Sequence, residues 1–169
     1  MIILHTPDEL RQWRAAQNGS IGFVPTLGHL HEGHLSLLRA ARDEHPVVIA
    51  SIFLNPLQFG SDADLESYPV TIDADRAHLE KLNSDALFQP AEADIYPDNF
   101  NTVVKPVASA GKWEDEFRPG HFDGVCTVIA KLFNLVRPDA AYFGEKDYQQ
   151  LNVVSAMVED LNIPVKIVP

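Results

Sequence analysis

The chain has 169 residues, of which 46% are hydrophobic and 22% charged, and its formal net charge is −11. This composition fits one soluble globular domain, and the acidic balance argues against a nucleic-acid binder, because phosphate backbones need clustered lysine and arginine. No apolar run approaches the roughly 20 residues of a membrane span, and no signal-peptide pattern is visible, so we expect no membrane partner and a cytoplasmic location. The single cysteine, Cys126, lies among apolar residues, which predicts a buried and unreactive thiol.

Short apolar runs alternate with longer amphipathic runs along the chain. A strand is predicted at 1–5 and a helix at 6–17, where Thr6, Pro7 and Glu9 form a capping box with proline at the first helical position. The next predicted elements are a strand at 20–25, a helix at 32–45, a strand at 46–54, a helix at 72–83 capped by Thr71, a strand at 85–90, a helix at 122–136, a strand at 140–144, a helix at 145–162 and a strand at 165–168. Between 90 and 121 we expect one short strand, at 101–106.

Alternating helices and nearly continuous apolar strands are typical of a parallel sheet with helices on both faces. Right-handed crossovers then predict a Rossmann-like, doubly wound α/β fold with three layers, in which ligands bind beyond the carboxyl ends of the strands. Three polar segments directly follow predicted strands, so we expect them at one edge of the sheet: TLGHLHEGH at 26–34, NPLQFG at 55–60 and GEKDYQQ at 144–150.

The segment PTLGHLHEGH leads from a strand into a helix and carries His29, His31 and His34. A glycine-bearing turn there presents free backbone N–H groups, and the helix dipole adds partial positive charge, which predicts an anion site. Imidazoles that project into the site can donate hydrogen bonds, and a polyphosphate would favour their protonated forms. We therefore expect nucleotide affinity to weaken as the pH rises through the histidine range. Gly33 leaves room for a flat ring against the backbone.

Two other interpretations of these histidines stay open. They could bind zinc, although His31 and His34 are three residues apart rather than the four of zincin-type helices, and the glycines predict a turn rather than a rigid platform. They could also be polar residues at a helix start without any chemistry, but their spacing argues against it. Neither glycine-rich phosphate motif, G-x-x-x-x-G-K-[ST] or G-x-G-x-x-G, is present.

The HEGH pattern in this strand–turn–helix setting resembles the H-x-G-H signature of nucleotidylyl-transferring enzymes, which class I aminoacyl-tRNA synthetases share. Further segments extend the resemblance along essentially the whole chain, to the pantothenate synthetase (pantoate–β-alanine ligase) family: SIFLNPLQFG, DLESYPVT and RPGHFDGVCTVIAKLFNLVRPDAAYFGEKDYQQL. The resemblance implies a nucleotidylyltransferase-like fold and ATP-dependent condensation of pantoate with β-alanine. The reaction would pass through a pantoyl adenylate, release AMP and pyrophosphate, and use Mg²⁺ with ATP. It also implies a homodimer.

The resemblance further implies an ATP site. His31 and His34 would contact the phosphates, with His34 as proton donor, and Lys146 would add a cation. The implied ATP-binding residues are Leu27, Gly28, His31, Glu32, Gly33, His34, Gly144, Glu145, Lys146 and Asp147. Asp75 is the protein candidate for the magnesium ion.

The acid and the amine are expected at a neighbouring place. Gln58, Gln150 and Asn55 would bind pantoate, and Gln58 would also contact β-alanine. Neutral amides suit this role because they donate to carboxylates and accept from hydroxyls. Tyr68 either lines the same pocket or packs in its loop, and Arg118 is either an anion clamp or a surface arginine.

The chain departs from the family pattern at three places. Leu27 stands where the family has methionine, and His29 stands where it has a small or amide side chain, which leaves the role of His29 open. The chain stops at VKIVP, before the family's serine-rich loop and smaller C-terminal domain. Residues 1–169 are therefore expected to form the nucleotide- and pantoate-binding domain, feebly active or inactive by itself. The alternatives are another H-x-G-H nucleotidylyltransferase and a non-catalytic nucleotide-binding domain.

Overall fold

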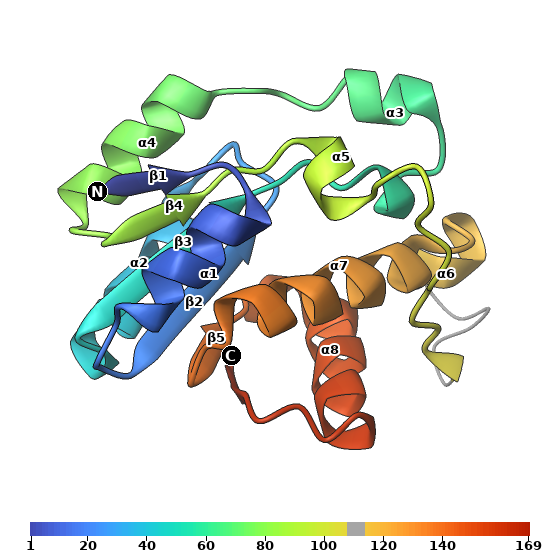
Figure 1. The fold of residues 1–169 in the computed structure, drawn as a ribbon. Coiled ribbons are helices and arrows are strands. Elements are labelled where there is room, and N and C mark those ends of the chain that lie inside the picture. Colours follow the sequence, from blue (N-terminus) through green and yellow to red (C-terminus); the bar gives the residue numbers. More distant parts are fainter. Residues whose placement is uncertain (108–113) are drawn as a thin grey trace.

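The computed structural model of the chain describes residues 1–107 and 114–169 (Figure 1). Six parallel strands form one sheet in the order β1-β4-β3-β2-β5-β6, which confirms the predicted doubly wound parallel fold. The strands are β1 (Ile2–Leu4), β2 (Ile21–Thr26), β3 (Val47–Ile52), β4 (Ala86–Phe88), β5 (Ala140–Tyr142) and β6 (Lys166–Val168).

Helices connect the strands and cover both faces of the sheet. The longer ones are α1 (Pro7–Ala15), α2 (Glu32–Glu44), α4 (Ile72–Lys81), α7 (His121–Val136) and α8 (Tyr148–Asp160). Shorter helical turns are η1 (Pro56–Gln58), α3 (Asp62–Glu66), α5 (Glu92–Ile95), α6 (Glu114–Phe117) and η3 (Glu145–Asp147). Among the described residues, no helix combines the length and the apolar character needed to cross a membrane.

Strand side chains alternate between two hydrophobic clusters, one on each face of the sheet. On β2, Phe23 belongs to the cluster that α1, α7 and α8 cover, whereas Val24 belongs to the cluster that α2 and α4 cover. Phe23 meets Phe133 of α7 edge to face, with the ring centroids 6.4 Å apart. Cys126 of α7 is buried in the first cluster, which confirms the prediction of a buried cysteine, and burial raises the pKa of its thiol to about 12.

The direction in which the chain crosses the sheet reverses at β2. From β2 the chain moves outward through β3 to β4, and it later returns so that β5 pairs with the free side of β2. The segments that leave β2 and β5 lead to α2 and α8, which lie on opposite faces. A crevice therefore opens between them at the carboxyl ends of the strands, where doubly wound sheets bind their ligands.

The predicted helix starts are confirmed at α1 and corrected at α4. The Thr6 hydroxyl accepts from the Glu9 amide at 3.2 Å, and the Glu9 carboxylate accepts from the Thr6 amide at 3.1 Å. Thr71 does precede α4, but its side chain makes no capping bond to the backbone. Its hydroxyl donates instead to the carboxylate of Asp75, at 3.2 Å.

The prediction of a strand at 101–106 is wrong. These residues have no regular structure, and the Val104 amide donates to the hydroxyl of Thr127 on α7, at 2.9 Å, rather than to a neighbouring strand. The described parts of the connection between β4 and α7 contain α5 and α6 instead. Without a partner strand, an apolar run gains no ladder of hydrogen bonds, so its β preference has no effect.

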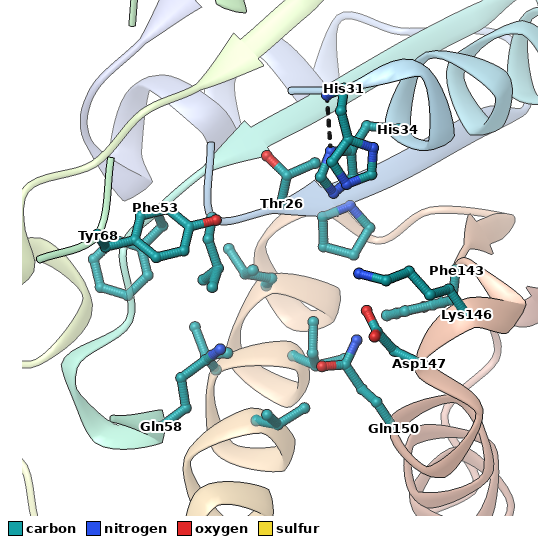
Figure 2. A pocket seen from close by; sticks show the side chains of 16 residues that line it. Thr26, His31, His34, Phe53, Gln58, Tyr68, Phe143, Lys146, Asp147 and Gln150 are labelled. Carbon is teal, nitrogen blue, oxygen red and sulfur yellow. Dashed lines mark hydrogen bonds between the residues drawn. The ribbon is translucent and has the colours of Figure 1, made fainter. Parts of the chain in front are cut away.

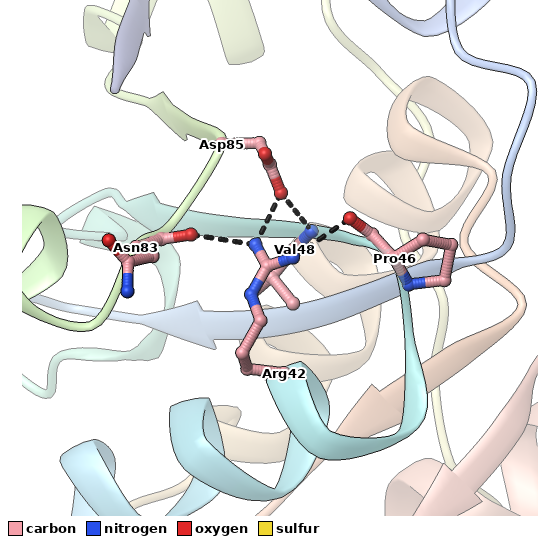
Figure 3. A network of polar contacts seen from close by, with 5 residues as sticks. All are labelled: Arg42, Pro46, Val48, Asn83 and Asp85. Atoms are coloured by element: carbon pink, nitrogen blue, oxygen red, sulfur yellow. Dashed lines mark hydrogen bonds and ion pairs between the residues drawn. The ribbon is translucent and has the colours of Figure 1, made fainter.

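Arg42 of α2 ties several segments together at the edge of the sheet opposite the crevice (Figure 3). Its guanidinium donates to the carbonyls of Pro46, at 2.8 Å, and Asn83, at 2.7 Å, and forms an ion pair with Asp85. The Asp85 carboxylate also accepts from the Val48 amide, at 2.7 Å. A single guanidinium group therefore joins the end of α2 to the segments that precede β3 and β4.

Replacing Arg42 should destabilise the fold. We expect Arg42→Met to lower the free energy of unfolding by about 2 kcal/mol, because three acceptors lose their donor at once. The matched control is Arg39→Met on the same helix, which removes only an exposed ion pair with Glu32 and should therefore lower the free energy of unfolding much less. Urea unfolding measures the free energy of unfolding of both variants. An equal decrease in the two variants would contradict the role of Arg42 in joining these segments.

Candidate active site

A pocket of about 230 Å³ opens at the crevice between β2 and β5 (Figure 2). Its polar lining consists of Thr26, His31, His34, Gln58, Tyr68, Lys146, Asp147 and Gln150. Its apolar lining consists of Pro25, Leu27, Phe53, Val125, Val128, Ile129, Leu132 and Phe143. All three segments that the sequence placed at one edge of the sheet contribute to this pocket.

Asp75 of α4 holds the turn that joins β2 to α2. Its carboxylate, which is 2% exposed, accepts from the amides of His29, at 2.9 Å, and Leu30, at 2.8 Å. Gly28 and His29 both have left-handed backbone, with φ of 92° and 52°. A Cβ on Gly28 would lie 3.1 Å from Ile52 and 3.3 Å from the Asp75 carboxylate, so glycine is favoured by its conformation and by its tight surroundings.

This bonding bears on the metal expectations. Both oxygens of Asp75 serve donors of the chain itself, so the geometry favours a structural role, and Asp75 as a magnesium ligand stays a prediction that the bonding does not support. Within residues 1–107 and 114–169, no group of three or more His, Cys, Asp or Glu side chains is arranged to hold a metal ion. The zinc interpretation of the histidines therefore gains no support.

The two histidines of the HEGH motif are stacked at the start of α2. His31 is the N-cap residue, and its Nδ1 accepts from the Gly33 amide at 3.1 Å. The Nδ1 of His34 accepts from the His31 amide at 3.4 Å, and the two ring centroids are 4.1 Å apart. A Cβ on Gly33 would lie 2.9 Å from the His31 ring, which confirms the predicted reason for glycine there.

The capping bonds determine how these rings can meet an anion. A nitrogen that accepts a backbone N–H carries no proton, so each ring is a neutral imidazole with its proton on Nε2. Burial is the main cause that lowers the pKa of His34 from 6.5 to about 4. With these capping bonds made, the helix start presents Nε2–H donors, and protonation of the rings beside a bound polyphosphate stays a prediction.

The opposite wall comes from the segment that follows β5. In Figure 2 the Lys146 ammonium points toward the histidine pair, and the Gln150 amide points into the space between them and Gln58. Lys146 is exposed, whereas Gln150 is half-buried at the start of α8. A positive charge and two amides therefore face the helix start across one cavity.

The structure sorts the residues that the resemblance implied. Residues that line the pocket are Leu27, His31, His34, Gln58, Lys146, Asp147 and Gln150, together with Tyr68. The other implied ATP contacts lie in the same two segments but do not line it: Gly28, Glu32, Gly33, Gly144 and Glu145. Asn55 is fully buried behind the wall, so a direct pantoate contact from it is not what the geometry favours. Arg118 is exposed and does not line the pocket, and His29 faces a neighbouring cavity.

The sequence interpretation missed the apolar floor of the pocket and a tyrosine behind its wall. The floor is one stripe of α7 formed by Val125, Val128, Ile129 and Leu132. Its helical spacing was visible, but such a stripe usually indicates core. Tyr96 contacts Asn55 from the far side of the wall, and no local pattern indicates this contact.

Residues 2–169 match the family model described as pantoate-beta-alanine ligase. This chain belongs to that family. The pantothenate synthetase of Allorhizobium ampelinum is 55% identical over 150 residues, which are 89% of this chain and 52% of that protein. The pantothenate synthetase of Brucella ovis is 53% identical over 171 residues, which are 99% of this chain and 58% of that protein.

Solved structures of the family superimpose closely on this chain. Pantothenate synthetase from Thermus thermophilus has a TM-score of 0.93 at 50% identity, over 99% of this chain and 60% of that one. Pantoate-beta-alanine ligase from Francisella tularensis, complexed with beta-gamma ATP and beta-alanine, has a TM-score of 0.96 at 42% identity, over 99% and 66%. The family and its nucleotidylyltransferase-like fold are thus as predicted. The chain spans a little over half the length of the curated relatives it matches.

The lowered pKa of His34 should appear in the pH dependence of stability. The unfolded chain takes up a proton on His34 below pH 6.5, whereas the folded chain resists it until about 4. The contribution of neutral His34 is therefore complete above pH 6.5 and is lost as the pH falls from there toward 4. As the pH falls from 6.5 to about 4, we expect the free energy of unfolding to decrease less in His34→Gln than in the unmodified protein. Urea unfolding at several pH values measures this difference.

The matched control is His78→Gln, because it makes the same substitution at an exposed histidine. A stability difference between His34→Gln and the unmodified protein that stays constant across the interval would contradict a suppressed pKa.

Proposed function

We propose that this protein takes part in the ATP-dependent condensation of pantoate with β-alanine, through a pantoyl adenylate and with release of AMP and pyrophosphate. Family membership supports the reaction class. The observation that carries the proposal is the pocket itself. It sets the HEGH helix start and Lys146 opposite the two glutamines Gln58 and Gln150 (Figure 2).

The histidine side of the pocket suits a triphosphate. The Nε2–H groups of His31 and His34 and the Lys146 ammonium would hold the phosphates, at the positive end of the α2 dipole. In the first step a pantoate carboxylate oxygen bonds to the α-phosphorus while the bond to the β-phosphate oxygen breaks. Charge then grows on the departing pyrophosphate, and preorganised donors stabilise that charge without having to reorganise. In this proposal His34 donates a hydrogen bond to the phosphates from a neutral ring.

The glutamine side suits pantoate. Pantoate carries a carboxylate and two hydroxyls around a carbon with two methyl groups. Gln58 and Gln150 can bind the polar groups, and the floor formed by Val125, Val128, Ile129 and Leu132 can cover the methyl groups. In the second step the β-alanine amine bonds to the acyl carbon, and AMP departs with the bonding electron pair. ATP and β-alanine as ligands are supported by the Francisella tularensis complex, whose title names beta-gamma ATP and beta-alanine.

Magnesium fits this pocket as a companion of the nucleotide rather than as a resident ion. The described residues offer no cluster of three metal-binding side chains, and Asp147 is a carboxylate that lines the pocket. Phosphate oxygens and water would supply most ligands, as is usual for Mg²⁺ bound with nucleotides, and the ion would neutralise phosphate charge. A homodimer and a cytoplasmic location stay expectations from the sequence.

Pantoate-dependent exchange of labelled pyrophosphate into ATP tests the proposal. We expect slow exchange with pantoate and none without it. We also expect Gln58→Ala and Gln150→Ala to weaken pantoate binding by at least about tenfold, because each removes a hydrogen bond to a polar ligand, with ATP affinity unchanged. Calorimetry measures both affinities.

The rival functions give different outcomes in these assays. Exchange supported by another acid but not by pantoate would indicate a different nucleotidylyltransferase. ATP binding without exchange, and with no binding of pantoate, would indicate a nucleotide-binding domain. Either result would overturn the proposed reaction.

A further inference from the structure

We propose that Tyr96 is a positioning residue: through Asn55 it fixes the Gln58 amide with its NH₂ group toward the pocket, so that Gln58 meets an acceptor atom of the acid substrate. This inference rests on the proposed function. It assigns a direction to the Gln58 hydrogen bond and a role to a tyrosine that does not line the pocket.

The direction is set by a backbone carbonyl. Asn55 is 0% exposed, and its Nδ2 lies 3.1 Å from the carbonyl oxygen of Gly124. A carbonyl can only accept, so the NH₂ end of Asn55 must face Gly124. The other end, Oδ1, then faces the Tyr96 hydroxyl at 2.7 Å, and the tyrosine is the donor.

The orientation of Asn55 in turn determines the orientation of the Gln58 amide. The Asn55 NH₂ group also donates to Oε1 of Gln58, at 3.0 Å. Because the Gln58 oxygen faces Asn55, its nitrogen is the end left for the pocket that Gln58 lines. An amide held in this way presents N–H to a carboxylate or hydroxyl oxygen.

Tyr96 is itself well held and well suited to donate. Burial raises the pKa of its hydroxyl far above the usual value, so the proton stays on oxygen at any physiological pH. Its ring centroid lies 4.9 Å from that of Phe100 and 6.0 Å from that of Phe53. The Lys131 ammonium lies over the same ring, 5.6 Å from the centroid.

The backbone of Gln58 is fixed as firmly as its side chain. A Cβ on Gly124 would lie 2.3 Å from the carbonyl oxygen of Leu57 and 2.6 Å from the amide nitrogen of Gln58, so α7 and η1 touch backbone to backbone. His121 Nδ1 also lies 2.8 Å from the Gln58 carbonyl oxygen. Because the main chain of Gln58 is fixed, the remaining freedom of this residue is its amide orientation. The bonds of Asn55 to Gly124 and to Tyr96 together determine that orientation.

Tyr96→Phe tests the relay because it removes one hydroxyl and keeps the ring. We expect pantoate affinity to fall about tenfold, the effect of losing one buried hydrogen bond, while ATP affinity changes less than about twofold. The matched control is Tyr142→Phe, which removes another buried hydroxyl, bonded to Glu44 at 3.1 Å, away from the pocket. Calorimetric titration with pantoate and with ATP gives the four affinities.

A second measurement needs no substrate and so separates this inference from the proposed function. In nitrogen-15 NMR, the Gln58 side-chain NH₂ signal, assigned by its loss in Gln58→Ala, should shift in Tyr96→Phe and stay in place in Tyr142→Phe. An unmoved signal, unchanged pantoate affinity, or an equal loss of ATP affinity would overturn the positioning role. A shifted signal in a protein that binds no pantoate would keep the relay and reject the proposed reaction.

Discussion

The buried carboxylate of Asp75 is the interaction on which the site depends. It belongs to α4, yet it accepts from the amides of His29 and Leu30, in the turn between β2 and α2. A buried carboxylate is stable only when hydrogen bonds replace its hydration, and a left-handed turn persists only when its surroundings hold it. Here the amides of the turn supply the hydrogen bonds that the carboxylate needs, and the carboxylate holds the turn in its left-handed conformation. The direction in which α2 begins, and with it the position of His31 and His34, follows from this contact.

An acidic protein with a net charge of −11 can still offer an anion site, because the site relies little on net charge. Oriented peptide dipoles and neutral imidazole N–H groups attract phosphate without the desolvation cost of a buried cation. Lys146, on the other wall, adds a charge that stays exposed. The Nδ1 atoms of His31 and His34 accept the capping bonds at the start of α2. These bonds leave the Nε2 atom of each ring for the pocket.

The sequence was sufficient for what local pattern determines. The periodicity of α1, α2 and α7, the capping box at Thr6 and the gathering of three polar segments at one sheet edge were all predictable. Contacts between distant residues were not: Asn55 meets a tyrosine 41 residues away and a carbonyl 69 residues away, so its place behind the wall could not be inferred from its neighbours. Helices α3, α5 and α6 are too short to show a period, and the strand expected at 101–106 lacked a partner that only the fold could reveal.

The most direct test of the account is nitrogen-15 NMR of the His31 and His34 rings at neutral pH, before and after addition of ATP. The account predicts two neutral rings with the proton on Nε2, whose Nε2 signals move when ATP binds while the Nδ1 signals stay typical of an acceptor. Rings that become doubly protonated, or that do not respond to bound ATP, would contradict a triphosphate site built from capped imidazoles at the start of α2.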